Sequence, residues 1–423
     1  MKKFLSNIFL LFIITIVSCG LQAQNAAKAK YVFLFIGDGM GVNQVFVTEK
    51  YNELTKAEPL VFMNNKWAFG LSMTECADSN KITDSGAGGT AIACGERTSF
   101  GDIGEYKGKE LESIAEYLHT KMNFKIGIIT SVPLNHATPS CFYGHEPTRR
   151  NYDNLTNDLV ASGFELFAGG GFQLGNADSA KNIYKNFDGV IRKLSENDFQ
   201  MVFNEKQLTS VALPMKSRVM IIDTAIRNKQ QKLKNCYSDE KNSLPCILDE
   251  PGCKMKLAAY TECAQNLLMN DNGFFIMVEG GKIDWACHDN DALTAIWEIN
   301  AFNEAIKKAY EFYLKHPENT LIIVTADHET GGMAQGARPD DKTPGKKDGY
   351  ALQIKKLLVQ KQSYIYTTGD SLQKIQKAAR IGWTTFEHSS APVGVWAIGN
   401  GSEKFSGIIK NSDIKEKILN LVR

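Results

Sequence analysis

The sequence predicts an α/β fold in which a mostly parallel central sheet is flanked by helices on both faces. Short apolar runs rich in β-branched and aromatic residues end abruptly at Gly, Asp or His, and helix-patterned stretches separate them. Runs without polar alternation are typical of strands buried on both faces, which occur chiefly in parallel sheets. The chain has 423 residues, 43% of them hydrophobic and 22% charged, which is enough material for a large core.

The predicted elements follow one another along the chain with polar loops between them. We predict helices at residues 110–122 and 291–314, and less regular insertions at about 176–256 and 335–384. No internal repeat is present, so residues 24–423 are predicted to form one domain. The predicted strands are residues 31–36, 125–131, a run at 167–171 that ends in a turn, 219–222, 273–278, 320–325 and 393–398.

The N-terminal segment is typical of an export signal. Two lysines precede an apolar run at residues 8–17, which is too short for a permanent membrane span. Residues 1–23 are therefore predicted to be a signal peptide, with cleavage either after Ala23 or before Cys19, where the sequence resembles a bacterial lipoprotein box. Both cuts remain open. The protein is expected to be exported, either periplasmic or lipid-anchored at the cell envelope through Cys19.

The net charge indicates the class of partner, and the number of cysteines indicates the cellular compartment. The net charge of +1 gives no basic footprint for nucleic acid, so a small-molecule partner is expected. Nine cysteines favour an oxidising compartment. Four of them form one cluster along the chain: Cys236, Cys246, Cys253 and Cys263. We predict disulfides among these four, for which three connectivities are possible. Free buried thiols are the alternative.

One stretch, residues 83–91, organises the predicted site. Ser85 follows an acid and precedes small residues typical of a crowded first helical turn, so its hydroxyl is expected at a helix N-terminus. Backbone N–H groups there suit an anion such as phosphate. A capped, Gly-rich turn without chemistry is the alternative.

Other polar clusters follow predicted strands, where α/β proteins bind ligands. Asp284 and His288 are four residues apart, so on a helix they share one face, as two ligands of one metal would. Adjacent arginines include Arg149, whose guanidinium can hold a phosphate in two places. The remaining candidates at such positions are Asp38, His136, Thr138, Glu279, Asp327, His328 and His388.

These residue types suit two kinds of metal site. Histidine with aspartate suits zinc, whereas carboxylates with a hydroxyl suit magnesium. Two zinc ions roughly 4 Å apart can clamp the attacking and leaving oxygens of a displacement at phosphorus. A serine hydroxyl bound to zinc can ionise and act as a nucleophile.

With these motifs the chain resembles the alkaline phosphatase family over nearly the whole mature sequence. The motifs that carry the resemblance, in order, are residues 37–41, 83–85, 136–139, 145–149, 279–288 and 325–332, and then His388.

The resemblance implies hydrolysis of small phosphate monoesters through a phosphoserine on Ser85, with Arg149 binding phosphate. It implies one zinc held by Asp284, His288 and His388. A second zinc would be held by Asp38, Asp327 and His328 with Ser85. One magnesium would be held by Asp38, Thr138 and Glu279, with His136 close by. A homodimer is also a family expectation.

Three positions depart from the family pattern. Gly86 and its glycine neighbours stand where relatives usually have Ala or Ser, which loosens a helix start because Gly costs about 1 kcal/mol against Ala. Trp285 stands where relatives carry varied residues that touch phosphate through water, and Cys287 is unusual. The short insertion before His388 implies little of the crown seen in larger relatives.

Other functions remain as alternatives. A phosphodiesterase or nucleotide pyrophosphatase of the same superfamily typically uses threonine as nucleophile and lacks the magnesium set, so Ser85, Thr138 and Glu279 argue against it. A sulfatase needs a Cys/Ser-x-Pro-x-Arg motif, which is absent from the sequence. An exported binding lipoprotein without turnover should have lost a ligand or the nucleophile.

Overall fold

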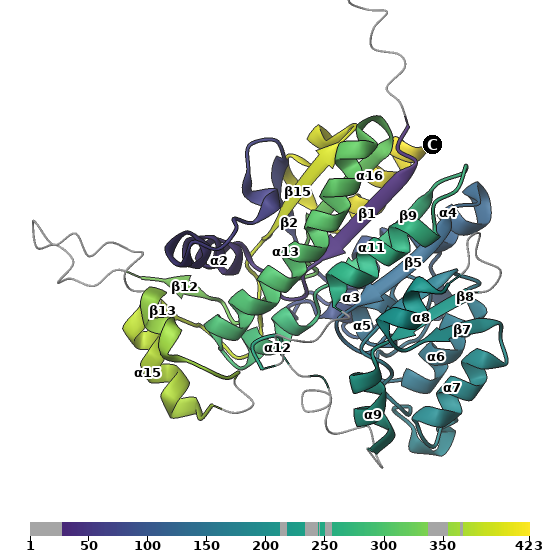
Figure 1. Cartoon of the computed structure of the whole chain (residues 1–423), viewed down its shortest axis with the longest axis horizontal. Helices are drawn as coiled ribbons and strands as arrows, with labels where there is room; N and C mark the ends of the chain where they lie inside the picture. Colours follow the sequence, from purple (N-terminus) through teal and green to yellow (C-terminus); the bar gives the residue numbers. More distant parts are fainter. Residues whose placement is uncertain are drawn as a thin grey trace, which may run out of the picture.

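A ten-stranded sheet forms the centre of the computed structural model (Figure 1). The structure describes residues 28–211, 218–232, 244, 246–249, 256–336, 354–363 and 367–423. The predicted signal segment with Cys19 lies outside these residues, as do Cys236 and Cys253. The strands in sheet order are β16 (Gly407–Lys410), β2 (Ala68–Met73), β15 (Val393–Gly399), β10 (Thr320–Thr325), β1 (Tyr31–Ile36), β9 (Phe274–Glu279), β5 (Lys125–Thr130), β6 (Leu166–Gly169), β8 (Arg218–Ile222) and β7 (Phe199–Val202).

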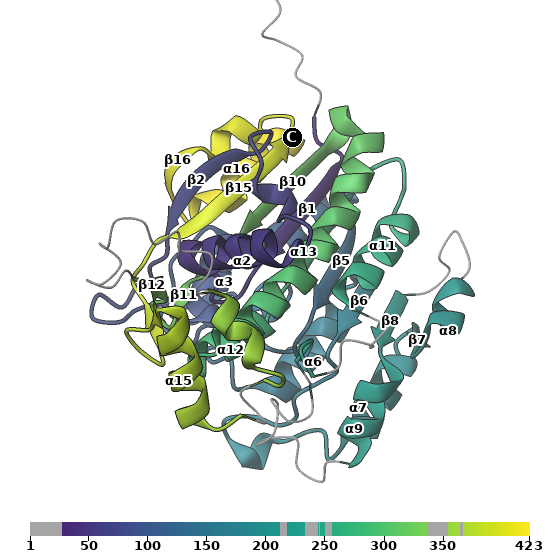
Figure 2. The same cartoon turned by 60° about the vertical axis from the view of Figure 1, so that its left-hand side comes forward.

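Most of the sheet is parallel, which confirms the predicted fold class. All neighbours from β10 through β1, β9, β5, β6 and β8 to β7 pair in parallel. Only β15 runs against its neighbours β10 and β2 among these ten strands. Figure 2 shows β16 and β7 at opposite edges. The segment at 176–256 supplies β7 and β8, so it extends one edge of the sheet.

Helices cover both faces of the sheet, as the apolar strands predict. Along β1, Val32 and Leu34 join a core with α3, α4, α6, α7 and α16, whereas Phe33 and Phe35 join a core with α11, α12 and α13. The helices are α2 (Val42–Thr55), α3 (Ser85–Cys94), α4 (Ile114–Met122), α5 (Ala137–Ser140), α6 (Tyr152–Ala161), α7 (Phe187–Ser195), α8 (Glu205–Thr209), α9 (Thr224–Lys232), α11 (Leu257–Leu267), α12 (Lys282–His288), α13 (Ala292–Lys315), α15 (Gly369–Ala379) and α16 (Asp413–Val422).

Most of the predicted helices and strands are present in the structure. Strands 31–36 and 320–325 have the predicted bounds, and α13 starts after the N-cap Asp291. The helix predicted from residue 110 starts instead at Ile114, because Ser113 and Glu116 form a capping box there. Three strands of the sheet, β2, β7 and β16, were not predicted.

Short pairs of strands lie around the carboxyl edge of the sheet. β11 (Glu329–Thr330) pairs with β14 (His388–Ser389), which brings the last predicted histidine beside the loop after β10. The other short strands are β3 (Glu105–Tyr106), β4 (Lys109–Glu110), β12 (Ala334–Gln335) and β13 (Ile381–Gly382).

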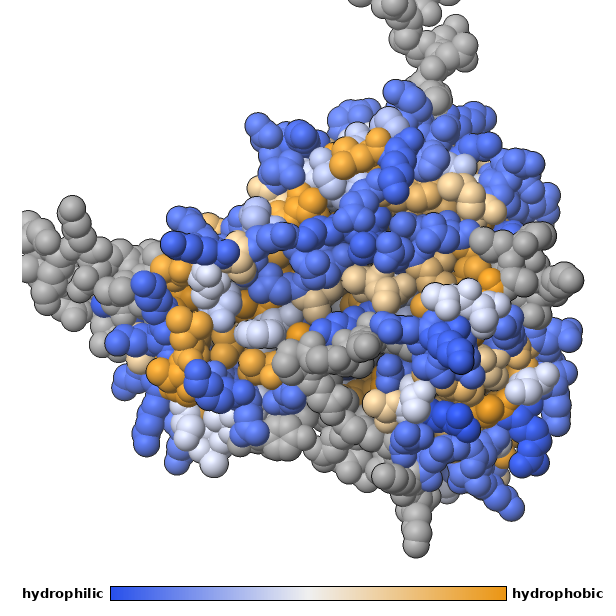
Figure 3. All heavy atoms as spheres, in the orientation of Figure 1, coloured by the Kyte–Doolittle hydropathy of each residue, from blue (hydrophilic) through white to orange (hydrophobic). Residues whose placement is uncertain are grey.

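The surface and the cysteines give no further indication of function. Hydrophilic side chains cover much of the face in Figure 3, and apolar ones gather toward its left side, around α15. Within the described ranges, no helix is long and apolar enough to cross a membrane. No disulfide joins Cys246 to Cys263, the two members of the predicted cluster that the structure describes.

Candidate active site

The ends of three central strands bring three carboxylates together. Ile36 at the end of β1 is in register with Thr325 of β10 and with Glu279 of β9. Asp38 and Asp327 each follow their strand by two residues, and all three carboxylates are 0% exposed. The sheet therefore fixes these carboxylates at one edge.

The turn after β1 is closely packed against this cluster. Gly39 has φ +67°, and a Cβ there would lie 2.6 Å from Thr330 Oγ1 and 2.9 Å from Asp284 Oδ1. Its N–H donates to Asp327 Oδ1 at 3.3 Å. Glycine is required here by both the conformation and the close approach.

Ser85 is the first residue of α3, as predicted. The side chain of Asp84 caps this helix by accepting from the backbone N–H groups of Gly86 and Ala87, both at 3.2 Å. The glycines that follow are densely packed, since a Cβ at Gly88 would lie 2.7 Å from the carbonyl oxygen of Asp327. The departure from the family pattern at this helix therefore accompanies a close approach to the carboxylate loop.

Ser85, Asp38 and Asp327 converge on an imidazole nitrogen of His328, the fourth residue predicted to share this metal. His328 Nε2 lies 3.2 Å from Ser85 Oγ and 3.5 Å from Asp38 Oδ1 and from Asp327 Oδ2. Thr330 Oγ1 donates to Asp284 Oδ1 at 2.5 Å and so accepts from His328 Nδ1 at 3.2 Å. Burial lowers the pKa of His328 well below its usual value, so the ring is neutral and Nε2, which faces carboxylate oxygens, carries no proton.

The predicted outer set also assembles. Asp284 and His288 lie on α12, and with His388 they offer ligand atoms within 4.8 Å of one another. His288 Nδ1 donates to the carbonyl of Phe386 at 2.5 Å, and His388 Nδ1 donates to the carbonyl of Thr83 at 2.9 Å. These bonds leave both Nε2 atoms available as ligands.

Asp38 also belongs to a third cluster. Asp38, His136 and Glu279 place one ligand atom each within 4.8 Å of one another. The hydroxyl of Thr138 lies 3.3 Å from Asp327 Oδ2 and also interacts with the carboxylate of Glu279. The predicted magnesium residues are thus brought together, with His136 beside them.

Burial and mutual repulsion dominate the electrostatics of these carboxylates. Burial, and then the charges of Asp327, Asp284 and Glu279, raise the pKa of Asp38 well above its usual range. Burial is also the main cause that raises the pKa of Glu279 to about 8 and of Asp327 to about 7. Burial also raises the pKa of Asp284, but the neighbouring histidines outweigh it and the net shift is downward.

These residues fit divalent cations. Within the described part of the chain, the buried oxygens Asp38 Oδ1 and Glu279 Oε1 accept no hydrogen bond. The unprotonated His328 Nε2 faces carboxylates, so acceptors face acceptors at 3.5 Å. Buried charges are normally paired or coordinate metals, and cations bound at these clusters would pair with these atoms.

Arg149 lies in the loop before α6 and contacts Asp84, the residue before Ser85. Its Nη1 donates to Asp84 Oδ2 at 3.0 Å, and its Nη2 lies 3.2 Å from His136 Nε2. Asp84 therefore both caps the nucleophile helix and orients the guanidinium. Burial and then Arg149 lower the pKa of His136 well below its usual value, so its imidazole is neutral.

The other departures from the family pattern pack inside the protein. Trp285 is 5% exposed, packs with Val132 and Leu244, and meets the ring of His136 edge-on at 6.2 Å. Cys287 is buried, and its Sγ lies 4.0 Å from Gln44 Nε2.

Several residues of the site were missed by sequence reasoning. Thr330 links Asp284 to His328, and Glu329, Gln44 and Ser389 form a hydrogen-bonded network beside them. Thr330 and Glu329 directly follow the predicted Asp-His pair, which is a usable signal, but nothing in the sequence marks Gln44.

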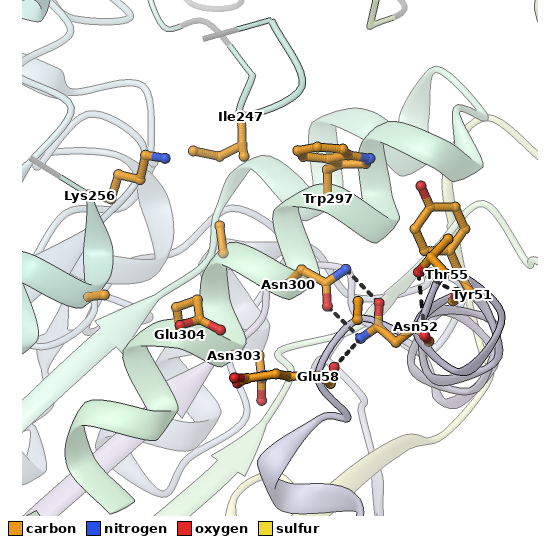
Figure 4. Close-up of a pocket in the computed structure, with 13 residues that line it drawn as sticks. Tyr51, Asn52, Thr55, Glu58, Ile247, Lys256, Trp297, Asn300, Asn303 and Glu304 are labelled. Carbon is orange, nitrogen blue, oxygen red and sulfur yellow. Dashed lines mark hydrogen bonds between the residues drawn. The ribbon is translucent and has the colours of Figure 1, made fainter. Parts of the chain in front are cut away.

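A pocket of about 470 Å³ lies apart from this site, between α2, α13 and residues near Ile247 (Figure 4). The hydrogen-bonded pair Asn52 and Asn300 lines the pocket, as does Trp297. None of the predicted site residues lines it.

The fold and the clusters of candidate metal ligands are typical of a metal-binding hydrolase. The family model for alkaline phosphatase matches residues 29–423, and the chain belongs to that family. It is a phosphomonoester hydrolase, as the motifs implied.

The chain is also similar to individual alkaline phosphatases, in sequence and in structure. The chain is 30% identical to alkaline phosphatase 4 of Bacillus subtilis, covering 95% of this chain and 90% of that protein. It is similar in structure to the alkaline phosphatase of the Antarctic bacterium TAB5, with TM-score 0.69, 29% identity, and coverage of 94% and 99%. The Shewanella sp. cold-active enzyme gives TM-score 0.71 at 25% identity, covering 93% and 100%. A histidine-to-glutamate variant of the TAB5 enzyme has Mg bound in its M3 site.

Proposed function

We propose that this phosphomonoesterase works through a phosphoserine on Ser85 at a site for two zinc ions and one magnesium ion. The observation that carries the proposal is the convergence of Ser85 Oγ, Asp38, Asp327 and the unprotonated Nε2 of His328. When bound, the metals would supply positive charge that favours ionisation of the serine hydroxyl and offsets charge on the phosphate oxygens.

The proposed ligands follow the three clusters. One zinc would take Asp284, His288 and His388, and the second would take Asp38, Asp327 and His328 with Ser85. Magnesium would take Asp38, Thr138 and Glu279, close to His136. The magnesium bound in the TAB5 variant supports a third site for that metal in a relative.

The protein's own groups account for positioning and bond making. Arg149 would hold two phosphate oxygens with its planar fork, while Asp84 keeps the fork oriented. The oxygen of Ser85 attacks phosphorus as the bond to the alcohol oxygen breaks, and water then cleaves the phosphoserine. Each turnover consumes one water and releases one alcohol and one inorganic phosphate.

Export remains part of the proposal. The lysines and the apolar run of the N-terminal segment support it, with lipid anchoring at Cys19 as one form, and a homodimer is expected from the family. The mass of the mature N-terminus distinguishes cleavage after Ala23 from a lipid-modified Cys19.

Phosphate release from an aryl phosphate monoester and from its matched diester tests the reaction. With zinc and magnesium supplied, the purified protein should cleave the monoester much faster than the diester, and a chelator should abolish both rates. Preference for the diester would instead support the phosphodiesterase alternative and remove the magnesium assignment at Thr138 and Glu279.

A further inference from the structure

We propose that Glu329 is a positioning residue that fastens the His388 strand to the metal site, and that it does so through Ser389. This inference rests on the proposed function, because it assigns His388 to the outer zinc. It adds a residue that no ligand set above includes.

Glu329 is a buried carboxylate, 3% exposed, and donors surround it. Its Oε1 accepts from Gln44 Nε2, and both of its oxygens accept from the backbone N–H of Gly332 at 3.0 Å. The hydroxyl of Ser389 donates to Oε2. Charge-assisted bonds of this kind are stronger than bonds between neutral groups.

The carboxylate joins three segments that are distant in sequence. Gln44 lies on α2 and also donates to the carbonyl of Thr330 at 2.9 Å. Glu329 lies on β11, and Ser389 lies on β14 directly after His388. The network therefore fixes β14 to the same short strand that carries the bridge between Asp284 and His328.

The His388 strand needs such support. The pairing of β11 with β14 covers only two residues of each strand, opposite Glu329 and Thr330. Such a short ladder is marginal alone. Yet the ring of His388 lies 3.7 Å from the ring of His328, and its Nε2 lies 3.8 Å from Asp284 Oδ1. Residues that orient metal ligands typically affect metal affinity 10- to 100-fold.

Zinc affinity of a Ser389→Ala variant tests the proposal, with Ser390→Ala as the matched control. Ser390 is the next residue and is exposed, so the same substitution is made outside the network. Competition with a zinc chelator should show one zinc held about 10- to 100-fold more weakly in Ser389→Ala. The second zinc and the magnesium should be unchanged. Excess zinc should restore kcat without a change in KM.

A Glu329→Gln variant should show the same selective loss, because its amide would place a donor against other donors. Zinc affinities equal to those of Ser390→Ala, in both Ser389→Ala and Glu329→Gln, would overturn the proposal. So would equal weakening of all metals together with a lower Tm of the metal-free protein, since that indicates a general structural role.

A His388→Ala variant separates this inference from the proposed function. If His388→Ala loses one zinc but Ser389→Ala and Glu329→Gln do not, the positioning role fails and the metal assignment stands. If His388→Ala keeps its full zinc content, the outer metal assignment itself fails, and the role of Glu329 fails with it.

Discussion

The inner and outer halves of the site are built in different ways. Asp38, Glu279 and Asp327 follow central strands and are 0% exposed, so the sheet itself holds them. In the outer half, the side chains of His288 and His388 are 26% and 13% exposed. Backbone carbonyls and the short strand β14 orient them. The inner half is therefore held by the sheet and rich in carboxylates, whereas the outer half depends on peripheral contacts.

The largest expected effect comes from the centre of the inner half. Ser85→Ala should lower kcat on the order of 10⁴-fold or more, because it removes the nucleophile. The variant should form no phosphoenzyme on rapid acid quench with labelled substrate, yet keep its metals. Wild-type rates in this variant would contradict the role of Ser85.

Removal of a ligand from the outer half should lower both the zinc content and the catalytic rate. His388→Ala should contain one zinc fewer and lose on the order of 10²-fold in kcat/KM. Elemental analysis and kinetics on the same sample check this. His119→Ala on α4, away from the site, serves as the control. Full activity with one zinc fewer would refute the assignment.

Phosphate binding by the arginine fork should show a smaller effect. Arg149→Lys keeps the charge but loses the planar pair of donors, so we expect KM to rise roughly 10-fold or more. Arg150→Lys makes the same change at the adjacent exposed residue and should leave KM unchanged. Inhibition by inorganic phosphate should weaken in parallel; equal KM values in the two variants would argue against the role of Arg149.

The smallest expected effect concerns stability near the Arg149 loop. Burial lowers the pKa of His145, but its 2.8 Å hydrogen bond to Glu116 outweighs burial and raises the pKa to about 9. A raised pKa gives stability that is complete below the unfolded value of about 6.5 and is lost as pH rises through about 9. His145→Gln should thus lower the free energy of unfolding by about 1–3 kcal/mol at pH 6.

Chemical unfolding of the metal-saturated protein at several pH values measures this difference. The gap between wild type and His145→Gln should shrink above pH 9. A gap independent of pH would mean that the charge of His145 contributes nothing.

The contrast between the two halves also explains what the sequence could predict. Asp38, Glu279 and Asp327 were predictable because apolar runs mark buried strands, and Asp284 with His288 because four residues make one helical turn. The contact of Ser389 with Glu329 spans 60 residues, and that of Gln44 with Glu329 spans 285. No local pattern encodes such contacts.

Two of the strands that were not predicted, β16 and β2, also lack a local sequence pattern that marks them. β16 exposes three of its four residues, and β2 alternates buried with more exposed positions around a glycine. Neither has the continuous apolar run of β1 or β10, because each lies toward the edge of the sheet.

Stepwise removal of zinc from the wild-type protein tests most directly whether the inner and outer halves of the site differ. Zinc per chain and activity would be measured together as a chelator is added. We predict that one zinc, from the more exposed outer set, leaves first, that activity falls with it, and that added zinc restores it. Loss of both zinc ions in a single step would contradict separate inner and outer sites.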